Sequence, residues 1–401
     1  MDFYNVLRIN KSEYRIDTIM KGTGISMYRI GIIGGGQLGK MMILDAKRLD
    51  YYFVILDPTK NCPADSIADE HIVASFDDVE AIKKLAECVD VVTYEFEHIN
   101  AKALQLLEEQ GHKVYPSSET LLHIQNKLNQ KDWLCKHEIP VPDYLGVNGV
   151  DEILQAGEKY GYPIILKTCT GGYDGKGNAI IKTREEVETA FDCLGAGKFP
   201  LMVEEFVPFE KEVSILVCRS ANGDIKVFPV AENVHVNSIL DETTVPAVIS
   251  KESTDEAMEI AKKTIEVFGC CGMLCIELFV KKDGHILVNE LAPRPHNSGH
   301  YTIEGCYTSQ YENHIRAILS QPLGDTSLIR PTAMKNIIGQ TNGDANVQGL
   351  EEAYQKPGVK IHLYGKEKVA VGRKMGHITA TATTIEEALE AVRFAHKKIS
   401  F

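Results

Sequence analysis

Two glutamates, Glu277 and Glu290, flank a tight turn in the stretch CIELFVKKDGHILVNEL. The Asp-Gly dipeptide in this stretch is a strong local signal for a β-hairpin, and it predicts a two-residue loop closed by Lys282 and His285. Counting outward from that loop places Glu277 directly opposite Glu290, with Cβ atoms roughly 5 Å apart. Two like charges in this position repel each other, so the pair needs a partner that neutralises it.

The neighbours of these two glutamates are apolar, which makes an unpaired charge costly. They are Leu274, Ile276, Leu278, Val288 and Leu291. Two structural explanations stay open, namely an exposed pair at a sheet edge and a pair that shares one proton. The functional explanation is Mg²⁺, which binds oxygen ligands and usually takes one or two protein carboxylates together with substrate phosphates. The register therefore predicts a magnesium site and, with it, a bound nucleotide.

A glycine-rich stretch, TGGYDGKGN, could hold the phosphates of that nucleotide. Its flexible backbone N–H groups can surround an anion, and they come with a cation, in Gly171, Gly172, Gly175, Lys176 and Gly177. The spacing does not fit a Walker loop, and the flanking segments YPIILKT and AIIKT are both strand-like. A glycine hairpin between strands can act as a lid, although an ordinary mobile loop has the same composition.

Charged side chains also end the apolar strands nearby. Lys167 closes YPIILKT, where it could either extend to solvent or meet the phosphates of a nucleotide. Glu204 and Glu205 close LMVEEFV, and Glu212 follows them. Solvated surface acids remain the alternative explanation for each of these glutamates.

Residues 30–40, IGIIGGGQLGK, match a dinucleotide-binding fingerprint through Gly34, Gly36 and Gly39, and Asp57 closes the next apolar run. A fingerprint of this kind indicates a tight turn and close helix–strand packing, and by itself it does not show a bound dinucleotide. An NAD-dependent dehydrogenase is therefore one rival hypothesis, although no hydride-transfer site is evident elsewhere. We expect no NAD binding, and we expect ATP in the following domain.

Strand and helix patterns alternate from Met27 to about Pro116, which predicts a Rossmann-like parallel sheet. Prolines near position 140 mark the start of a region of strands joined by short turns, which predicts an antiparallel α+β domain. The expected parts are a tail over 1–26, a Rossmann-like domain over 27–122, an ATP-binding domain over 123–325 with a lid at about 140–205, and a small β-rich domain over 326–401.

The composition narrows the function to small-molecule chemistry. The chain has 401 residues, 44% of them hydrophobic, and a formal net charge of −13. This acidic balance argues against nucleic-acid and membrane-surface partners, which require a basic face. No apolar run approaches the ~20 residues needed to cross a bilayer, and the ten cysteines contain no C-x-x-C pair, so we expect a cytoplasmic protein with reduced thiols.

A strand lysine, a glycine lid, an acidic segment and paired glutamates on adjacent strands together resemble the ATP-grasp superfamily. The segments IGIIGGGQLGKM, TYEFEHI, GGYDGKG and NELAPRPHNSGHYTIE resemble, more closely, the superfamily's ligases that carboxylate 5-aminoimidazole ribonucleotide in purine biosynthesis. The likeness runs in order from about Met27 to the C-terminus, and PRPHNSGH is its most specific part. It implies ATP and Mg²⁺, bicarbonate as co-substrate, carboxyphosphate as intermediate and a homodimer.

The resemblance also implies roles for individual residues. Those that would bind ATP are Lys127, Lys167, Gly172, Tyr173, Gly175, Lys176, Glu204, Glu205, Val207, Glu212 and Asn289. Glu277 and Glu290 would hold Mg²⁺. Those that would bind the imidazole ribonucleotide are Glu95, Tyr173, Asp174, His235, Arg294, His296, Asn297, Lys366 and Arg373. Arg294, His296, Lys176 and Asp174 would take part in catalysis, and Asn233 and His235 are weaker candidates near bicarbonate.

Two features depart from the superfamily pattern. Many members carry an asparagine two residues past the second metal glutamate, where this chain has Ala292, and strand alternation directs Asn289 to the opposite face. The first 26 residues also lie outside the resemblance.

Two further rival functions remain. One is another ATP-grasp ligase that acts on formate or a different carboxylate, and the other is a non-catalytic nucleotide sensor.

Overall fold

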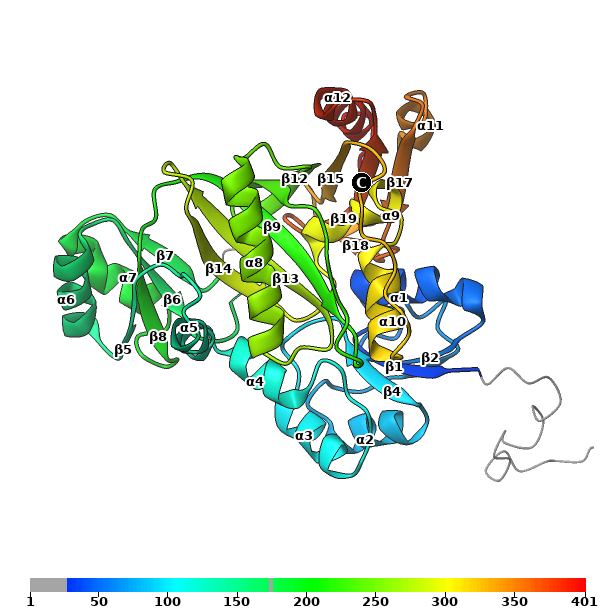
Figure 1. The fold of residues 1–401 in the computed structure, drawn as a ribbon, viewed down its shortest axis with the longest axis horizontal. Coiled ribbons are helices and arrows are strands. Elements are labelled where there is room, and N and C mark those ends of the chain that lie inside the picture. Colours follow the sequence, from blue (N-terminus) through cyan, green and yellow to red (C-terminus); the bar gives the residue numbers. More distant parts are fainter. Residues whose placement is uncertain (1–26, 173–175) are drawn as a thin grey trace, which may run out of the picture.

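A computed structural model describes residues 27–172 and 176–401. Its N-terminal part is a parallel sheet with strand order β3-β2-β1-β4, as the alternating pattern predicts (Figure 1). Side chains of β2 alternate between two cores, since Phe53 and Ile55 pack on one face and Val54 and Leu56 on the other. The elements are β1 (Arg29–Ile33), α1 (Gln37–Ala46), β2 (Tyr52–Leu56), β3 (Glu70–Ile72), α2 (Val79–Glu87), β4 (Val91–Tyr94), α3 (Ala101–Glu109) and α4 (Ser118–Gln125).

A smaller antiparallel sheet, with strand order β5-β8-β6-β7, stands apart from the rest of the molecule in Figure 1. Helix α5 (Lys127–Lys136) leads into it along the chain. Its elements are β5 (Tyr144–Val147), α6 (Val150–Tyr160), β6 (Ile164–Thr168), β7 (Asn178–Ile181), α7 (Val187–Cys193) and β8 (Leu201–Glu205). The predicted glycine lid connects β6 to β7, and its residues 173–175 lie outside the described part of the chain.

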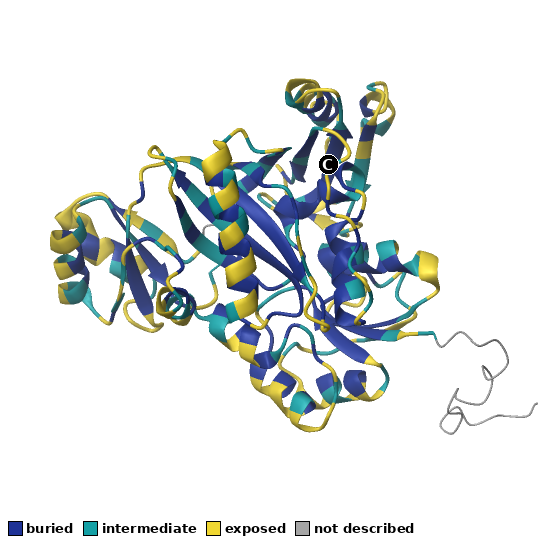
Figure 2. Cartoon of the chain, in the orientation of Figure 1, coloured by how far each residue is buried: buried dark blue, intermediate teal, exposed yellow. Residues whose placement is uncertain are grey.

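The largest sheet is antiparallel and has nine strands, with β10 paired to β9 beside the path β14-β13-β9-β11-β12-β15-β19-β17. Helix α8 covers one face, where it packs on Ile215 and Val217, and α10 lies on the other. Figure 2 shows these strands buried beneath α8, whose outer side is exposed. The elements are β9 (Phe209–Arg219), β10 (Ile225–Val227), β11 (Ala231–Val236), β12 (Ile239–Val245), α8 (Lys251–Val267), β13 (Gly272–Lys281), β14 (Ile286–Ala292), α9 (Thr302–Gly305) and α10 (Gln310–Ile318).

The C-terminal part continues this sheet, because β15 pairs with β12 through contacts such as Met334 with Thr243. The remaining elements are β15 (Thr332–Ile338), β16 (Gly343–Asp344), α11 (Leu350–Ala353), β17 (Val359–Leu363), β18 (Lys368–Val369), β19 (Lys374–Thr381) and α12 (Ile385–His396). The predicted fold class is confirmed, with a parallel N-terminal sheet followed by antiparallel sheets. The domain boundaries themselves stay predictions. Within the described ranges no helix is both long and apolar enough to cross a membrane.

Candidate active site

Glu277 on β13 pairs with Glu290 on β14, as the sequence predicts. The predicted two-residue loop is wrong, however: the N–H of Lys281 donates to the carbonyl of His285 at 2.9 Å, so the loop has three residues and includes Gly284 at φ +87°. A β-bulge at Asn289 then offsets the extra loop residue and brings the two glutamates opposite each other. The longer loop and the bulge therefore cancel in their effect on the register. Because side chains stop alternating between the two faces at the bulge, the predicted direction of Asn289 no longer follows from strand alternation.

The two carboxylates lie in a polar cluster between β13, β14 and α5. Glu290 forms a close ion pair with the ammonium of Lys127, and Nε2 of His296 lies 3.6 Å from Oε1 of Glu277. Burial, followed by repulsion from Glu290, raises the pKa of Glu277 to about 7. The side chains keep 27% and 41% of their surface exposed, so a ligand can reach them.

The donor set fits Mg²⁺ that is shared with a phosphate ligand. Two opposed carboxylates supply hard oxygen atoms, and Mg²⁺ normally completes its shell with water and phosphate. No group of three or more His, Cys, Asp or Glu side chains forms a metal cage among the residues that the structure describes. The pair is thus suited to a cation that arrives with a nucleotide rather than one held by protein alone.

A second charged cluster is buried where α5 meets β6 and β8. Glu204 is 2% exposed, and its Oε2 accepts from Lys167 at 2.6 Å while Lys131 lies 3.0 Å from its Oε1. Burial raises the pKa of Glu204, but the two ammonium groups outweigh burial and hold the pKa at about 2. Glu204 and Lys167 were predicted from the sequence and Lys131 was not, although its spacing of four from Lys127 puts both lysines on one helix face.

Helix α5 also fixes the strand that carries Glu290. Lys131 donates to the carbonyl of Asn289 at 3.3 Å, and the N–H of Leu291 donates to Oε1 of Gln130 at 3.1 Å. These contacts lie immediately before and after Glu290, so α5 holds the backbone of β14 at that point. One helix thus positions a carboxylate of the opposed pair and the buried Glu204 together.

A third group of charged residues surrounds the PRPH loop after β14. Nε of Arg294 donates to Oε2 of Glu97 at 2.6 Å, which ties this loop to the segment following β4. Burial raises the pKa of Glu97, but the guanidinium outweighs burial and lowers it to about 2. Burial and the charge of Arg294 lower the pKa of His296 to about 3, so that its imidazole is neutral. The amide of Asn297, which is 8% exposed, has no hydrogen-bond partner among the described residues and is available to a polar ligand.

The glycine fingerprint binds a carboxylate of the protein itself. The N–H groups of Gly36 and Gly39 both donate to the side chain of Glu95, which comes from the end of β4. A Cβ atom would lie 2.3 Å from this side chain at Gly34 and 2.5 Å from it at Gly36. The position at the start of α1 that would receive a dinucleotide phosphate is therefore filled by Glu95.

Further cations lie on and near the loop after β17, which a lysine of α1 contacts. Nζ of Lys40 donates to the carbonyl of Tyr364 at 3.1 Å, and Nζ of Lys366 donates to the carbonyl of Lys374 at 2.7 Å. Arg373, predicted with Lys366 to bind the imidazole ribonucleotide, is exposed and donates to the carbonyl of Lys368. Lys40 on α1 thus contacts the loop that carries Lys366.

Three other predicted residues form hydrogen bonds with neighbouring side chains or backbone. His235 hydrogen-bonds Glu212 at 2.7 Å, and this bond outweighs burial and raises the pKa of the imidazole. Nδ2 of Asn233 donates to Ser214 at 2.8 Å and its Oδ1 accepts from Thr243 at 2.9 Å, so its role near bicarbonate stays a prediction. Oε1 of Glu205 accepts from the N–H of Asp143.

The remaining predicted residues fall in two classes. Val207 is buried beyond the end of β8. Gly172 and Lys176 flank the part of the lid that contains Tyr173, Asp174 and Gly175, and these three residues lie outside the described residues.

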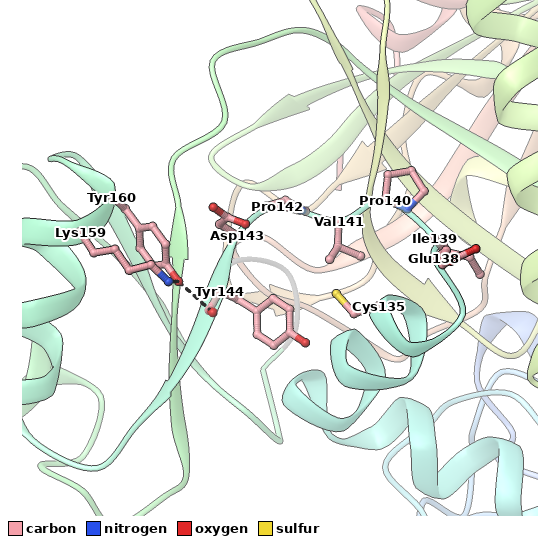
Figure 3. Close-up of a pocket in the computed structure, with 10 residues that line it drawn as sticks. All are labelled: Cys135, Glu138, Ile139, Pro140, Val141, Pro142, Asp143, Tyr144, Lys159 and Tyr160. Atoms are coloured by element: carbon pink, nitrogen blue, oxygen red, sulfur yellow. Dashed lines mark hydrogen bonds between the residues drawn. The ribbon is translucent and has the colours of Figure 1, made fainter.

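A surface groove lies beside the chain that leads from α5 into β5 (Figure 3). Its lining includes Cys135, Pro140, Asp143 and Tyr144, and the hydroxyl of Tyr160 donates to the carbonyl of Tyr144 at 2.9 Å. None of the predicted site residues lines it. The groove therefore marks the connection to the small sheet rather than the predicted chemistry.

Three family models match successive parts of the chain. They describe a ribonucleotide synthetase preATP-grasp domain over 27–125, an ATP-grasp domain over 132–311 and a phosphoribosylaminoimidazole carboxylase C-terminal domain over 332–391.

Among curated proteins, the N5-carboxyaminoimidazole ribonucleotide synthase of Bacillus subtilis is 43% identical over 366 residues, which cover 90% of this chain and 94% of that protein. The phosphoribosylaminoimidazole carboxylase of Candida albicans is 40% identical, and the match covers 90% of this chain but 65% of that protein.

Solved structures agree with these matches. The N5-carboxyaminoimidazole ribonucleotide synthetase of Thermotoga maritima has a TM-score of 0.85 and 43% identity, covering 93% of this chain and 99% of that one. The Aspergillus clavatus synthase in complex with ADP and 5-aminoimidazole ribonucleotide has a TM-score of 0.86 and 36% identity, covering 92% and 98%. With close relatives matched over nearly their full length and all three domain models in order, this chain belongs to the N5-carboxyaminoimidazole ribonucleotide synthase family of the ATP-grasp superfamily.

Proposed function

We propose that this chain uses ATP to carboxylate the exocyclic amine of 5-aminoimidazole ribonucleotide with bicarbonate in purine biosynthesis. The products are N5-carboxyaminoimidazole ribonucleotide, ADP and phosphate. The family membership supports this reaction. The observation in the structure that carries it is the opposed pair Glu277 and Glu290 beside Lys127, which together suit a nucleotide–metal complex.

The ATP site is assigned to the side chains around α5 and the small sheet. Glu277 and Glu290 would hold Mg²⁺, which supplies positive charge to the transferring phosphoryl group when it is bound. Lys127 and Lys167 would exchange their present carboxylate partners for phosphate oxygens. The other residues assigned to ATP are Gly172, Tyr173, Gly175 and Lys176 in the lid, Glu204, Glu205 and Val207 at the adenine edge, Glu212 at the ribose, and Asn289.

The ribonucleotide site is assigned to the space between the PRPH loop and α1. Glu97 orients Arg294, neutral His296 lies next to it, and the amide of Asn297 is available for hydrogen bonding. Arg294 and His296, with Lys176 and Asp174 from the lid, would act on the reacting groups. The other residues assigned to this substrate are Glu95, Tyr173, His235, Lys366 and Arg373.

This set of residue types suits the chemistry. Bicarbonate is a poor electrophile, so an oxygen of bicarbonate attacks the γ-phosphoryl group and gives carboxyphosphate, with ADP as leaving group. The amine nitrogen then bonds to the carboxyl carbon, the C–O bond to phosphate breaks, and the nitrogen loses one proton. Carboxyphosphate is unstable in water, which explains why a glycine-hinged lid between β6 and β7 is required to cover the site. We also propose a homodimer located in the cytoplasm.

Phosphate release is the experiment that tests this function. With ATP, Mg²⁺ and bicarbonate, we expect release to rise strongly when 5-aminoimidazole ribonucleotide is added, and to be lost in Glu277→Gln and Glu290→Gln. Glu259→Gln, on the exposed side of α8, is the matched control and should keep full activity.

Each rival function predicts a different result. A ligase that uses formate or another carboxylate would release phosphate without aminoimidazole ribonucleotide, and a nucleotide sensor would bind Mg-ATP and release none. A dehydrogenase would bind NADH at micromolar concentration, which fluorescence titration measures. Unchanged activity in both glutamine variants would reject the metal assignment.

A further inference from the structure

Lys131 is a buried charge that the proposed mechanism leaves without a role. Its side chain is 2% exposed, although lysine is almost never fully buried unless it is paired. Its ammonium lies 3.0 Å from Oε1 of Glu204 and donates to the carbonyl of Asn289 at 3.3 Å. A paired charge at this depth brings a large desolvation cost, so its retention points to a function other than stability.

The two lysines that hold Glu204 differ in their freedom to move. Lys167 lies on β6 directly before the lid, and in the proposed function its ammonium turns to the phosphates of ATP. Lys131 is held from two sides, by Glu204 on β8 and by the backbone of β14, and it lies within a helix. Lys131 is therefore the partner that stays with Glu204 after ATP has bound.

Glu204 has acceptor capacity left for a ligand. An ionised carboxylate offers about four lone-pair positions, and the two ammonium groups occupy two of them. An ionised carboxylate accepts hydrogen bonds and cannot donate one. It therefore attracts the amine of adenine and repels the carbonyl that hypoxanthine and guanine carry at the same position.

We propose that Lys131 is a positioning residue that sets nucleotide specificity, because it keeps Glu204 ionised and oriented as the acceptor for the exocyclic amine of adenine. This inference rests on the proposed function, in which Glu204 lies at the adenine edge. Without Lys131, and with Lys167 on the phosphates, the buried carboxyl would take up a proton. It could then donate a hydrogen bond to a carbonyl, and the preference for adenine would fall.

The test compares ATP with inosine triphosphate, which has a carbonyl in place of the amine, in the assay with 5-aminoimidazole ribonucleotide. We expect Lys131→Met to lower the ratio of kcat/KM for ATP over inosine triphosphate by about tenfold or more, since a site built around one charged hydrogen bond discriminates by at least that much. Lys136→Met is the matched control, because this exposed lysine of α5 lies over the ring of Trp133. It should leave the ratio unchanged.

Two further variants keep the test decisive. Lys131→Gln retains a hydrogen-bond donor without the charge, and it replaces the methionine variant if that one does not fold. Glu204→Gln should lower the ratio by itself, and adding Lys131→Met to it should lower the ratio no further, because both changes remove the same interaction.

Different results would overturn the role of Lys131 and the proposed function. Equal losses of kcat/KM for both nucleotides in the Lys131 variants would show a structural role and overturn the inference. If the unmodified chain releases no phosphate with ATP, bicarbonate and aminoimidazole ribonucleotide, the proposed function fails first.

Discussion

Three glutamates of the candidate site form ion pairs with particular lysine or arginine side chains. Glu290 pairs with Lys127, Glu204 with Lys131 and Lys167, and Glu97 with Arg294. Glu277 differs, because the side chain that lies 3.6 Å from it is the neutral imidazole of His296, and burial followed by repulsion from Glu290 raises the pKa of Glu277 to about 7. A cation that binds here would offset the repulsion between Glu277 and Glu290.

Glu97 offers a direct test of how Arg294 is held. In Glu97→Gln the guanidinium loses a buried charged partner at 2.6 Å, so Arg294 should shift from its present position. We expect KM for aminoimidazole ribonucleotide to rise about tenfold or more, while the dissociation constant for ADP, measured by calorimetry, changes little. Glu109→Gln on the exposed side of α3 is the control. An equal weakening of ADP binding would show that Glu97 supports the whole fold instead.

Some residues of the candidate site could be predicted from the sequence and others could not. Glu277 and Glu290 were predictable because both lie in one hairpin, where strand pairing is set locally. Even there the loop length was wrong, and a bulge at Asn289 corrected the register. Lys131 and Glu97 were missed because their partners, Glu204 and Arg294, are 73 and 197 residues away, a separation over which no local pattern indicates contact.

At the scale of elements, the start of α1 is built around a carboxylate. Gly36 and Gly39 leave room for the side chain of Glu95, and their N–H groups bind it at the positive end of the helix. The strand–helix pattern and the glycine spacing were predictable from the sequence. The group that fills the turn was not, because it comes from β4 and the fingerprint is the same whether a phosphate or a side chain occupies it.

A methyl group at Gly36 should displace the side chain of Glu95 from the turn before α1. Its Cβ would lie 2.5 Å from Oε1 of Glu95, while the backbone φ of −77° is acceptable to alanine. We expect Gly36→Ala to lower the free energy of unfolding by about 1–3 kcal/mol in urea titrations, since a buried carboxylate loses its N–H partners.

Gly149→Ala is the matched control for that substitution. Gly149 also precedes a helix, its φ is −165°, and no atom lies within 4 Å of the added Cβ. The free energy of unfolding should change by less than about 1 kcal/mol. Similar losses in both variants would mean that contact with Glu95 is not the cause.

Across the whole molecule, buried polar contacts join parts that are distant in the sequence. His314 on α10 accepts from the N–H of Met273 on β13 at 3.1 Å through Nδ1, so its proton lies on Nε2, which donates to Thr93 on β4 at 2.8 Å. The parallel sheet and the large antiparallel sheet are thus linked through one imidazole. Neither this link nor the pairing of β12 with β15 has a local signature, which is why the sequence predicted the types of sheet but not how they join.

The neutral state of His314 predicts a pH effect on stability. Burial lowers its pKa to about 3, while in the unfolded chain the pKa is near 6.5. The unfolded state therefore binds an additional proton between these values, and the free energy of unfolding falls as pH decreases below 6.5. His314→Gln removes this contribution. As pH decreases, the free energy of unfolding of this variant should therefore fall less steeply than that of the unmodified chain, by about 1.4 kcal/mol per pH unit.

Urea titrations from pH 7 to pH 4.5 measure this difference. His285→Gln, at an exposed position in the hairpin loop, should keep the full slope of the unmodified chain. A slope in His314→Gln equal to that of the unmodified chain would show that the imidazole is already charged in the folded state.

In the proposed reaction ATP activates bicarbonate, and the fate of one oxygen atom tests this step. With bicarbonate labelled with oxygen-18, transfer of the γ-phosphoryl group makes a bicarbonate oxygen the bridge between carbon and phosphorus. That oxygen stays with phosphate when the carbon passes to the amine. We predict that mass spectrometry of the released phosphate, from reactions with 5-aminoimidazole ribonucleotide, finds one heavy oxygen per turnover. Unlabelled phosphate would mean that water attacks ATP and that bicarbonate is not phosphorylated.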